Sequence, residues 1–147
     1  MYLCDTNVWL ALALSGHGHH SVARDWLETI RKPATLIVCR ATQQSFLRLL
    51  TNATVLGAYG NPPLTNQQAW EAYEAILADD RVVFRADEPP GLEYLWKQFS
   101  LRDSASPKIW MDAYLAAFAI SAACTIVTSD RAYRQFAGLD LLLLGSA

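Results

Sequence analysis

Short apolar segments of strand length alternate with segments of helical periodicity along almost the whole chain, and this alternation strongly constrains the fold. The strand-like segments lie at residues 1–4, 36–39, 81–84, 125–128 and 141–144. Helical spacing of apolar residues is found at 8–14, 21–31, 41–50, 67–78, 92–99, 109–123 and 131–136. Strands that are joined through helices run parallel, and helices cover both faces of a parallel sheet. The sequence therefore predicts an α/β fold with a central, mostly parallel sheet of four or five strands.

The composition is that of a well-packed globular protein. The chain has 147 residues, of which 52% are hydrophobic and 18% charged, so we expect residues 1–147 to form a single domain. The net charge of −2 gives no overall attraction to nucleic acid. Cys4, Cys39 and Cys124 are odd in number and lack a metal-binding spacing, which indicates reduced thiols in a cytoplasmic protein. The sequence predicts neither a signal peptide nor a membrane span.

Three aspartates stand out against apolar surroundings. Asp5 follows the first predicted strand and Asp130 follows the strand at 125–128, and each is also suited to cap the helix that comes next. Asp112 is the only charged residue between 109 and 123, a segment that is apolar almost all the way round. Because burying a bare carboxylate is costly, Asp112 must be paired, neutralised or bound to a cation.

These aspartates are expected to meet at one edge of the sheet. The carboxyl ends of parallel strands are where ligands bind in open α/β sheets. Three carboxylates in a partly desolvated site repel one another, and a divalent cation offsets that charge. A set of oxygen ligands without Cys or His favours Mg²⁺ or Mn²⁺, and such a cation supports phosphodiester hydrolysis.

One glycine-rich loop carries His17, His19 and His20. The spacing of these residues matches no metal-binding pattern of known geometry, so we interpret the segment as an exposed loop that leads into the next helix.

Four segments carry a resemblance to a known family: LCDTNVWLAL at 3–12, SFLRLLT at 45–51, WMDAYLAAFA at 110–119 and TSDRAY at 128–133. In this order and spacing they resemble a PIN domain, and more closely a VapC-type toxin ribonuclease of a toxin–antitoxin pair. The resemblance implies an α/β/α sandwich and Mg²⁺- or Mn²⁺-dependent endoribonuclease activity on RNA. It also implies a homodimer and inhibition by a cognate VapB-like antitoxin.

The resemblance assigns roles to individual residues. The family's first acid corresponds to Asp5, the third to Asp112 and the fourth to Asp130, which would hold the metal and carry catalysis. Asn7 and Thr128 correspond to polar residues that orient these acids. The chain departs from the pattern at the second acid, where the family has Glu and this sequence has Ser45. This departure leaves open whether the site holds one metal ion or two.

The groups that would contact RNA are less well marked. Arg131 and Arg134 lie next to Asp130 and are the basic residues best placed to meet phosphates. The five tryptophans are expected to serve mainly as core residues, with Trp9 and Trp110 as the two near the predicted site.

Three other functions are alternatives to an active ribonuclease. A catalytically degenerate PIN domain would bind RNA or protein without cleaving, and Ser45 in place of Glu keeps that alternative open. A phosphohydrolase of the haloacid dehalogenase type needs a second acid two residues after the first, but position 7 is Asn. A nucleotide-binding module is disfavoured because no glycine-rich loop follows any predicted strand.

Overall fold

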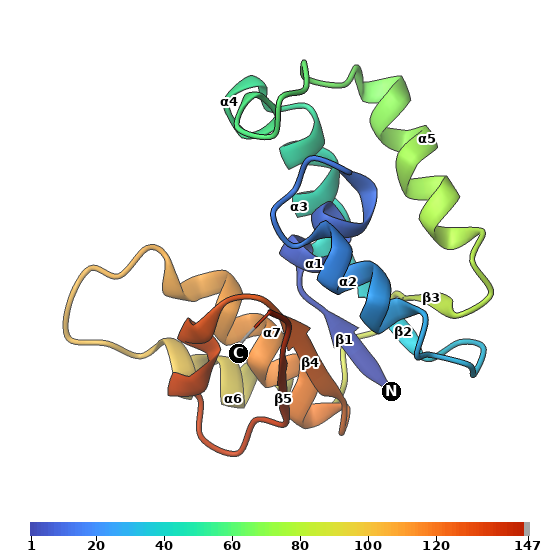
Figure 1. Cartoon of the computed structure of the whole chain (residues 1–147). Coiled ribbons are helices and arrows are strands. Elements are labelled where there is room, and N and C mark those ends of the chain that lie inside the picture. Colours follow the sequence, from blue (N-terminus) through green and yellow to red (C-terminus); the bar gives the residue numbers. More distant parts are fainter. Residues whose placement is uncertain (146–147) are drawn as a thin grey trace.

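A single parallel sheet forms the centre of the molecule in the computed structural model, which describes residues 1–145 (Figure 1). In space its strands follow the order β3-β2-β1-β4-β5. The strands are β1 (Tyr2–Cys4), β2 (Leu36–Cys39), β3 (Val82–Arg85), β4 (Thr125–Thr128) and β5 (Leu141–Leu143). The predicted parallel α/β fold is therefore confirmed. The last two residues of the predicted domain, 146 and 147, lie outside the described part of the chain.

The register of the sheet places the ends of β1 and β4 side by side. Cys4 is paired with Val127, and the amide of Asp5 donates to the carbonyl of Val127 over 2.9 Å. Asp5 therefore leaves β1 at the level where Thr128 ends β4. Because β1 and β4 are central neighbours, the order of the strands alone brings residues 5 and 128 together across more than a hundred positions of sequence.

Helices cover both faces of the sheet (Figure 1). One face packs against α1 (Thr6–Ala13), α2 (His20–Leu27), α3 (Arg40–Leu50), α4 (Ala53–Gly57) and α5 (Asn66–Leu77). The other face packs against α6 (Leu92–Ser100), α7 (Ile109–Ser121) and the short 3₁₀ helix η1 (Arg131–Gln135). Alternate residues of β1 serve the two cores, since Leu3 lies in the core under α7 and Cys4 in the core under α1.

Local sequence explains where α5 begins and why α7 is buried. Thr65 caps α5 by accepting from the amide of Gln68, and the Gln68 side chain accepts from the amide of Thr65 in return. α7 is buried on most sides, with Ala113, Leu115 and Ala117 fully inaccessible, which agrees with its apolar sequence.

Two predicted segments differ from the structure. The helix expected over 21–31 ends at Leu27, because Thr29 and Ile30 donate to carbonyls only three residues back and tighten the chain into a turn. The stretch 51–65, which the sequence predicts to be a loop, contains the short helix α4, which Asn52 caps and whose Leu56 is fully buried.

The tryptophans also depart from expectation. Trp9 is a core residue with 2% of its surface exposed, but Trp70 and Trp110 are 48% and 56% exposed. Within residues 1–145, no helix is long and apolar enough to cross a membrane.

Candidate active site

Asp5 lies at the junction between β1 and α1 and is buried there. One carboxylate oxygen, Oδ1, accepts from the backbone amide of Thr6 over 2.7 Å, so Asp5 caps α1. The other oxygen, Oδ2, accepts from the hydroxyl of Thr128 over 2.8 Å. The capping function and the position at the sheet edge therefore coexist in one side chain.

A small hydrogen-bond network joins the ends of β1 and β4 around the fully buried side chain of Thr128. While its hydroxyl donates to Asp5, the same oxygen lies 3.1 Å from Asn7 Nδ2 and 3.0 Å from the amide of Asp130. Asn7 Oδ1 accepts from the amide of Ser129 over 3.3 Å. The structure thus brings Asp5, Asn7 and Thr128 together as the sequence predicts, and it fixes the Asp5 carboxylate in one orientation.

Asp112 and Asp130 lie on the same side of this network. Asp130 caps η1 through Oδ1, which accepts from the amide of Ala132 over 2.8 Å. Asp112 is half-buried in the first turn of α7. Both line a cavity of about 410 Å³, whose rim also includes the basic side chains of Arg102 and Lys108.

Mutual repulsion affects the pKa values of two of these acids, Asp5 and Asp112. Burial raises the pKa of Asp5 from 3.8 to about 6, and the charges of Asp112 and Asp130 add to that increase. The hydrogen bonds from Thr128 and Thr6 oppose it. Burial and the charge of Asp130 also raise the pKa of Asp112. The three carboxylates therefore interact electrostatically, and a cation near them would offset their mutual repulsion.

Tyr133 belongs to this site, although the sequence did not single it out as a site residue. Its side chain is fully buried, and its hydroxyl lies close enough to Asp112 to oppose the rise in that carboxyl's pKa. Within the described residues, however, the hydroxyl makes no hydrogen bond of normal geometry. Burial and the neighbouring charges of Asp5, Asp112 and Asp130 raise the pKa of Tyr133. A tyrosine three residues after Asp130 on a short helix was the only available sequence signal.

The remaining predicted residues lie at more varied positions. Ser45 is buried on α3, a helix that packs against α1. Arg131 and Arg134 are exposed on η1 and are absent from the lining of the acidic cavity, so their contact with phosphates stays a prediction.

Two histidines of the loop predicted at 17–20 pack against other parts of the chain. His17 stacks on Tyr59 with ring centroids 4.6 Å apart, and His20 Nδ1 lies 2.6 Å from the carbonyl of Ala11.

The donor set suits a hard cation that keeps much of its own water. Within residues 1–145, no group of three or more His, Cys, Asp or Glu side chains converges closely enough to hold a metal ion directly. Mg²⁺ is commonly held by only one or two carboxylates and retains several waters. Asp5, Asp112 and Asp130 supply oxygen atoms and excess negative charge, and this is the chemistry that such an ion requires.

Comparison with known proteins identifies the family. The sequence pattern of the PIN domain matches residues 2–139. This chain belongs to the PIN domain family. It is 61% identical over 144 residues to Ribonuclease VapC41 of two strains of Mycobacterium tuberculosis, and the match covers 98% of this chain and 99% of that protein. The resemblance to VapC proteins found in the sequence is thereby confirmed.

Solved structures place this PIN domain among proteins of the same fold. VapBC2 from Rickettsia felis, solved bound to a DNA fragment from its promoter, superposes with a TM-score of 0.67 at 15% identity, covering 97% of this chain and 98% of that chain. Mycobacterium tuberculosis VapC20, a toxin that cleaves the sarcin–ricin loop, gives a TM-score of 0.66 at 17% identity, covering 95% and 96%. At these identities the likeness concerns the fold alone.

Proposed function

We propose that this PIN domain is a Mg²⁺- or Mn²⁺-dependent endoribonuclease toxin that cuts RNA phosphodiester bonds. The observation that carries the proposal is the proximity of Asp5, Asp112 and Asp130 at one edge of the sheet, where the charges of Asp112 and Asp130 raise the pKa of Asp5. The high identity to a protein named Ribonuclease VapC41 supports the same activity.

Each residue of the site has a distinct task in this mechanism. Asp5 and Asp112 would hold the cation from β1 and α7, and Asp130 would hold it from the start of η1. A bound cation supplies the Lewis acidity that activates water and stabilises the leaving oxygen. Thr128 keeps Asp5 in one orientation by donating to its Oδ2, and Asn7 supports Thr128 by donating to the same hydroxyl oxygen. Arg102 and Lys108 lie on the cavity rim, where their charge would attract the phosphates of an RNA strand.

We further propose that a cognate VapB-like antitoxin neutralises this toxin and that the chain acts as a homodimer in the cytoplasm. The structural likeness to VapBC2 supports an antitoxin partner. The thiols of Cys4, Cys39 and Cys124 are all free and buried, which suits a reducing compartment.

The test is cleavage of single-stranded RNA by the purified chain with Mg²⁺, with Mn²⁺ or with EDTA. We expect cleavage only with added metal. Asp130→Asn should abolish it without unfolding the protein, since asparagine also caps helices well. Asp25→Asn provides the matched control, because Asp25 is exposed on α2 on the opposite face of the sheet. Full cleavage by metal-stripped protein would contradict the mechanism.

The degenerate alternative has a specific observation in its favour, namely Ser45 at the position where the family has Glu. It predicts that the wild-type chain binds RNA but leaves it intact at every metal concentration. The same experiment therefore separates the two functions.

A further inference from the structure

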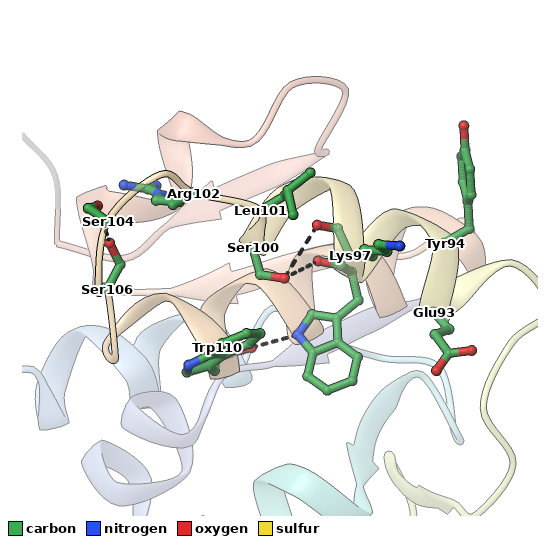
Figure 2. A pocket seen from close by; sticks show the side chains of 10 residues that line it. Glu93, Tyr94, Lys97, Ser100, Leu101, Arg102, Ser104, Ser106 and Trp110 are labelled. Carbon is green, nitrogen blue, oxygen red and sulfur yellow. Dashed lines mark hydrogen bonds between the residues drawn. The ribbon is translucent and has the colours of Figure 1, made fainter.

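A second, larger cavity lies beside the acidic one, and apart from Arg102 its lining residues have no role in the mechanism above. It is a groove of about 790 Å³ between α6, the loop 101–108 and the start of α7 (Figure 2). Its volume falls within the range of roughly 300–1,000 Å³ that is usual for ligand sites. The lining is mainly apolar and aromatic and includes Tyr94, Trp96, Leu101 and Trp110.

Three of the four apolar or aromatic side chains of this groove are unusually exposed. Tyr94 is 69% exposed, Leu101 74% and Trp110 56%. The backbone beneath Trp110 is nevertheless fixed, because the indole Nε1 of Trp96 donates to the carbonyl of Trp110 over 3.0 Å (Figure 2). The two indole rings meet edge to face with centroids 6.2 Å apart. Trp110 therefore offers a ring to solvent from a well-supported position.

The groove adjoins the acidic cavity. Arg102 and Ser106 line both cavities. The side chain of Arg102 also donates to Gln135 of η1, the helix that Asp130 caps. A ligand strand that passes over Asp112 and Asp130 would therefore reach the groove directly.

The charges of the groove favour an anionic ligand. Lys97 and Arg102 line it, against the single acid Glu93. Lys108 extends the positive rim toward the acids. Cationic groups interleaved with exposed aromatic rings are the features that bind single-stranded nucleic acid, because bases stack on the rings while phosphates meet the cations.

We propose that this groove binds the RNA segment next to the cleaved bond, with an unpaired base stacked on Trp110 and a phosphate paired with Arg102. The inference rests on the proposed ribonuclease function and names where its substrate continues beyond the metal site. RNA is favoured over a protein partner because the groove adjoins the cavity that Asp112 and Asp130 line and because Lys97 and Arg102 lie among its apolar residues. The centre of a protein interface is depleted in charge.

The test measures binding of a short, fluorescently labelled single-stranded RNA of mixed sequence in EDTA, where the proposed activity is off. Trp110→Ala should weaken binding about tenfold, because stacking of one base contributes on that order. Trp110→Phe should retain most of the affinity. Trp70→Ala is the matched control, since Trp70 is also exposed but lies on α5.

A second probe keeps the test decisive even if a Trp110 variant is unstable. RNA with abasic positions should bind the wild-type chain about tenfold more weakly. On that RNA, Trp110→Ala should cause no further loss. Equal binding by wild type and Trp110→Ala, or of intact and abasic RNA by wild type, would overturn the proposal.

The other possible occupants give different results. If the groove joins two copies of the chain, Trp110→Ala will lower the molar mass in light scattering and leave the RNA affinity unchanged, which overturns the proposal. If a protein partner fills it, Trp110→Ala will abolish antitoxin binding and leave the RNA affinity unchanged, which also overturns the proposal. Failure of the ribonuclease function itself is separate, because it shows as intact RNA when wild-type protein is supplied with Mn²⁺.

Discussion

Replacing Asp5 with Asn should stabilise the metal-free protein at neutral pH. Burial raises the pKa of Asp5 from 3.8 to about 6, so the folded chain keeps a proton that the unfolded chain has released between these pH values. Folding stability must therefore fall as pH rises through this window and stay lower above pH 6. The raised pKa of Asp112 acts in the same direction.

The magnitude follows from the displacement of the Asp5 pKa. A rise from 3.8 to about 6 corresponds to about 3 kcal/mol of lost stability at neutral pH. Asn at position 5 removes this charge but disturbs the hydrogen bond from Thr128, which contributes about 1 kcal/mol. The net gain should be about 2 kcal/mol, or roughly 4–8 °C in Tm for a chain of this size.

The assay is thermal unfolding of wild type and Asp5→Asn in EDTA from pH 4 to pH 8, repeated with Mn²⁺. We expect the wild-type Tm to fall between about pH 4 and pH 6, and we expect the variant to lose much less over that range. Added Mn²⁺ should raise the Tm of wild type more than that of the variant. If Asp5→Asn is less stable than wild type in EDTA at pH 7, Asp5 is chiefly a structural cap and the charge argument is wrong.

Three further predictions concern neighbouring positions. Asp112→Asn should lower RNA cleavage by orders of magnitude while the Tm in EDTA holds or rises, whereas a large loss of Tm would show a structural role. Ser45→Glu should lower the Mg²⁺ concentration for half-maximal cleavage by supplying a fourth carboxylate, and an unchanged midpoint in a Mg²⁺ titration would place Ser45 away from the metal. Tyr133→Phe should raise the Tm in EDTA, because it removes a buried hydroxyl without a hydrogen bond of normal geometry. The control for Tyr133→Phe is Tyr73→Phe, which should lower the Tm because the Tyr73 hydroxyl loses an interaction with Gln43.

The sequence predicted the sheet well because its signal is local. Apolar runs such as 36–39 and 125–128 coincide with β2 and β4 to the residue. Asp5 and Asp130 were identifiable for the same reason, since Asp5 directly follows β1 and Asp130 comes two residues after β4. Helix α4 was missed because its existence depends on a single capping side chain, Asn52, and on the burial of one leucine.

Features that depend on tertiary packing could not be predicted from the sequence. Tyr133 has an ordinary sequence context, and only the folded chain buries its hydroxyl among three carboxylates. Trp110 shares a helix with many core residues, so its helical spacing gave no sign that its ring is exposed. The groove it lines exists only because the loop 101–108 brings α6 back toward α7 (Figure 2).

The position of all three acids at the start of a helix explains how they coexist without a metal. Asp5 caps α1, Asp130 caps η1, and Asp112 lies in the first turn of α7. Backbone amides and the positive end of the helix dipole stabilise negative charge at these positions. Capping also fixes the direction of two of these carboxylates, because Oδ1 of Asp5 and of Asp130 is bound to a backbone amide. Helix capping therefore holds Asp5 and Asp130 in place, and the repulsion that remains among the three acids is what a divalent cation would relieve.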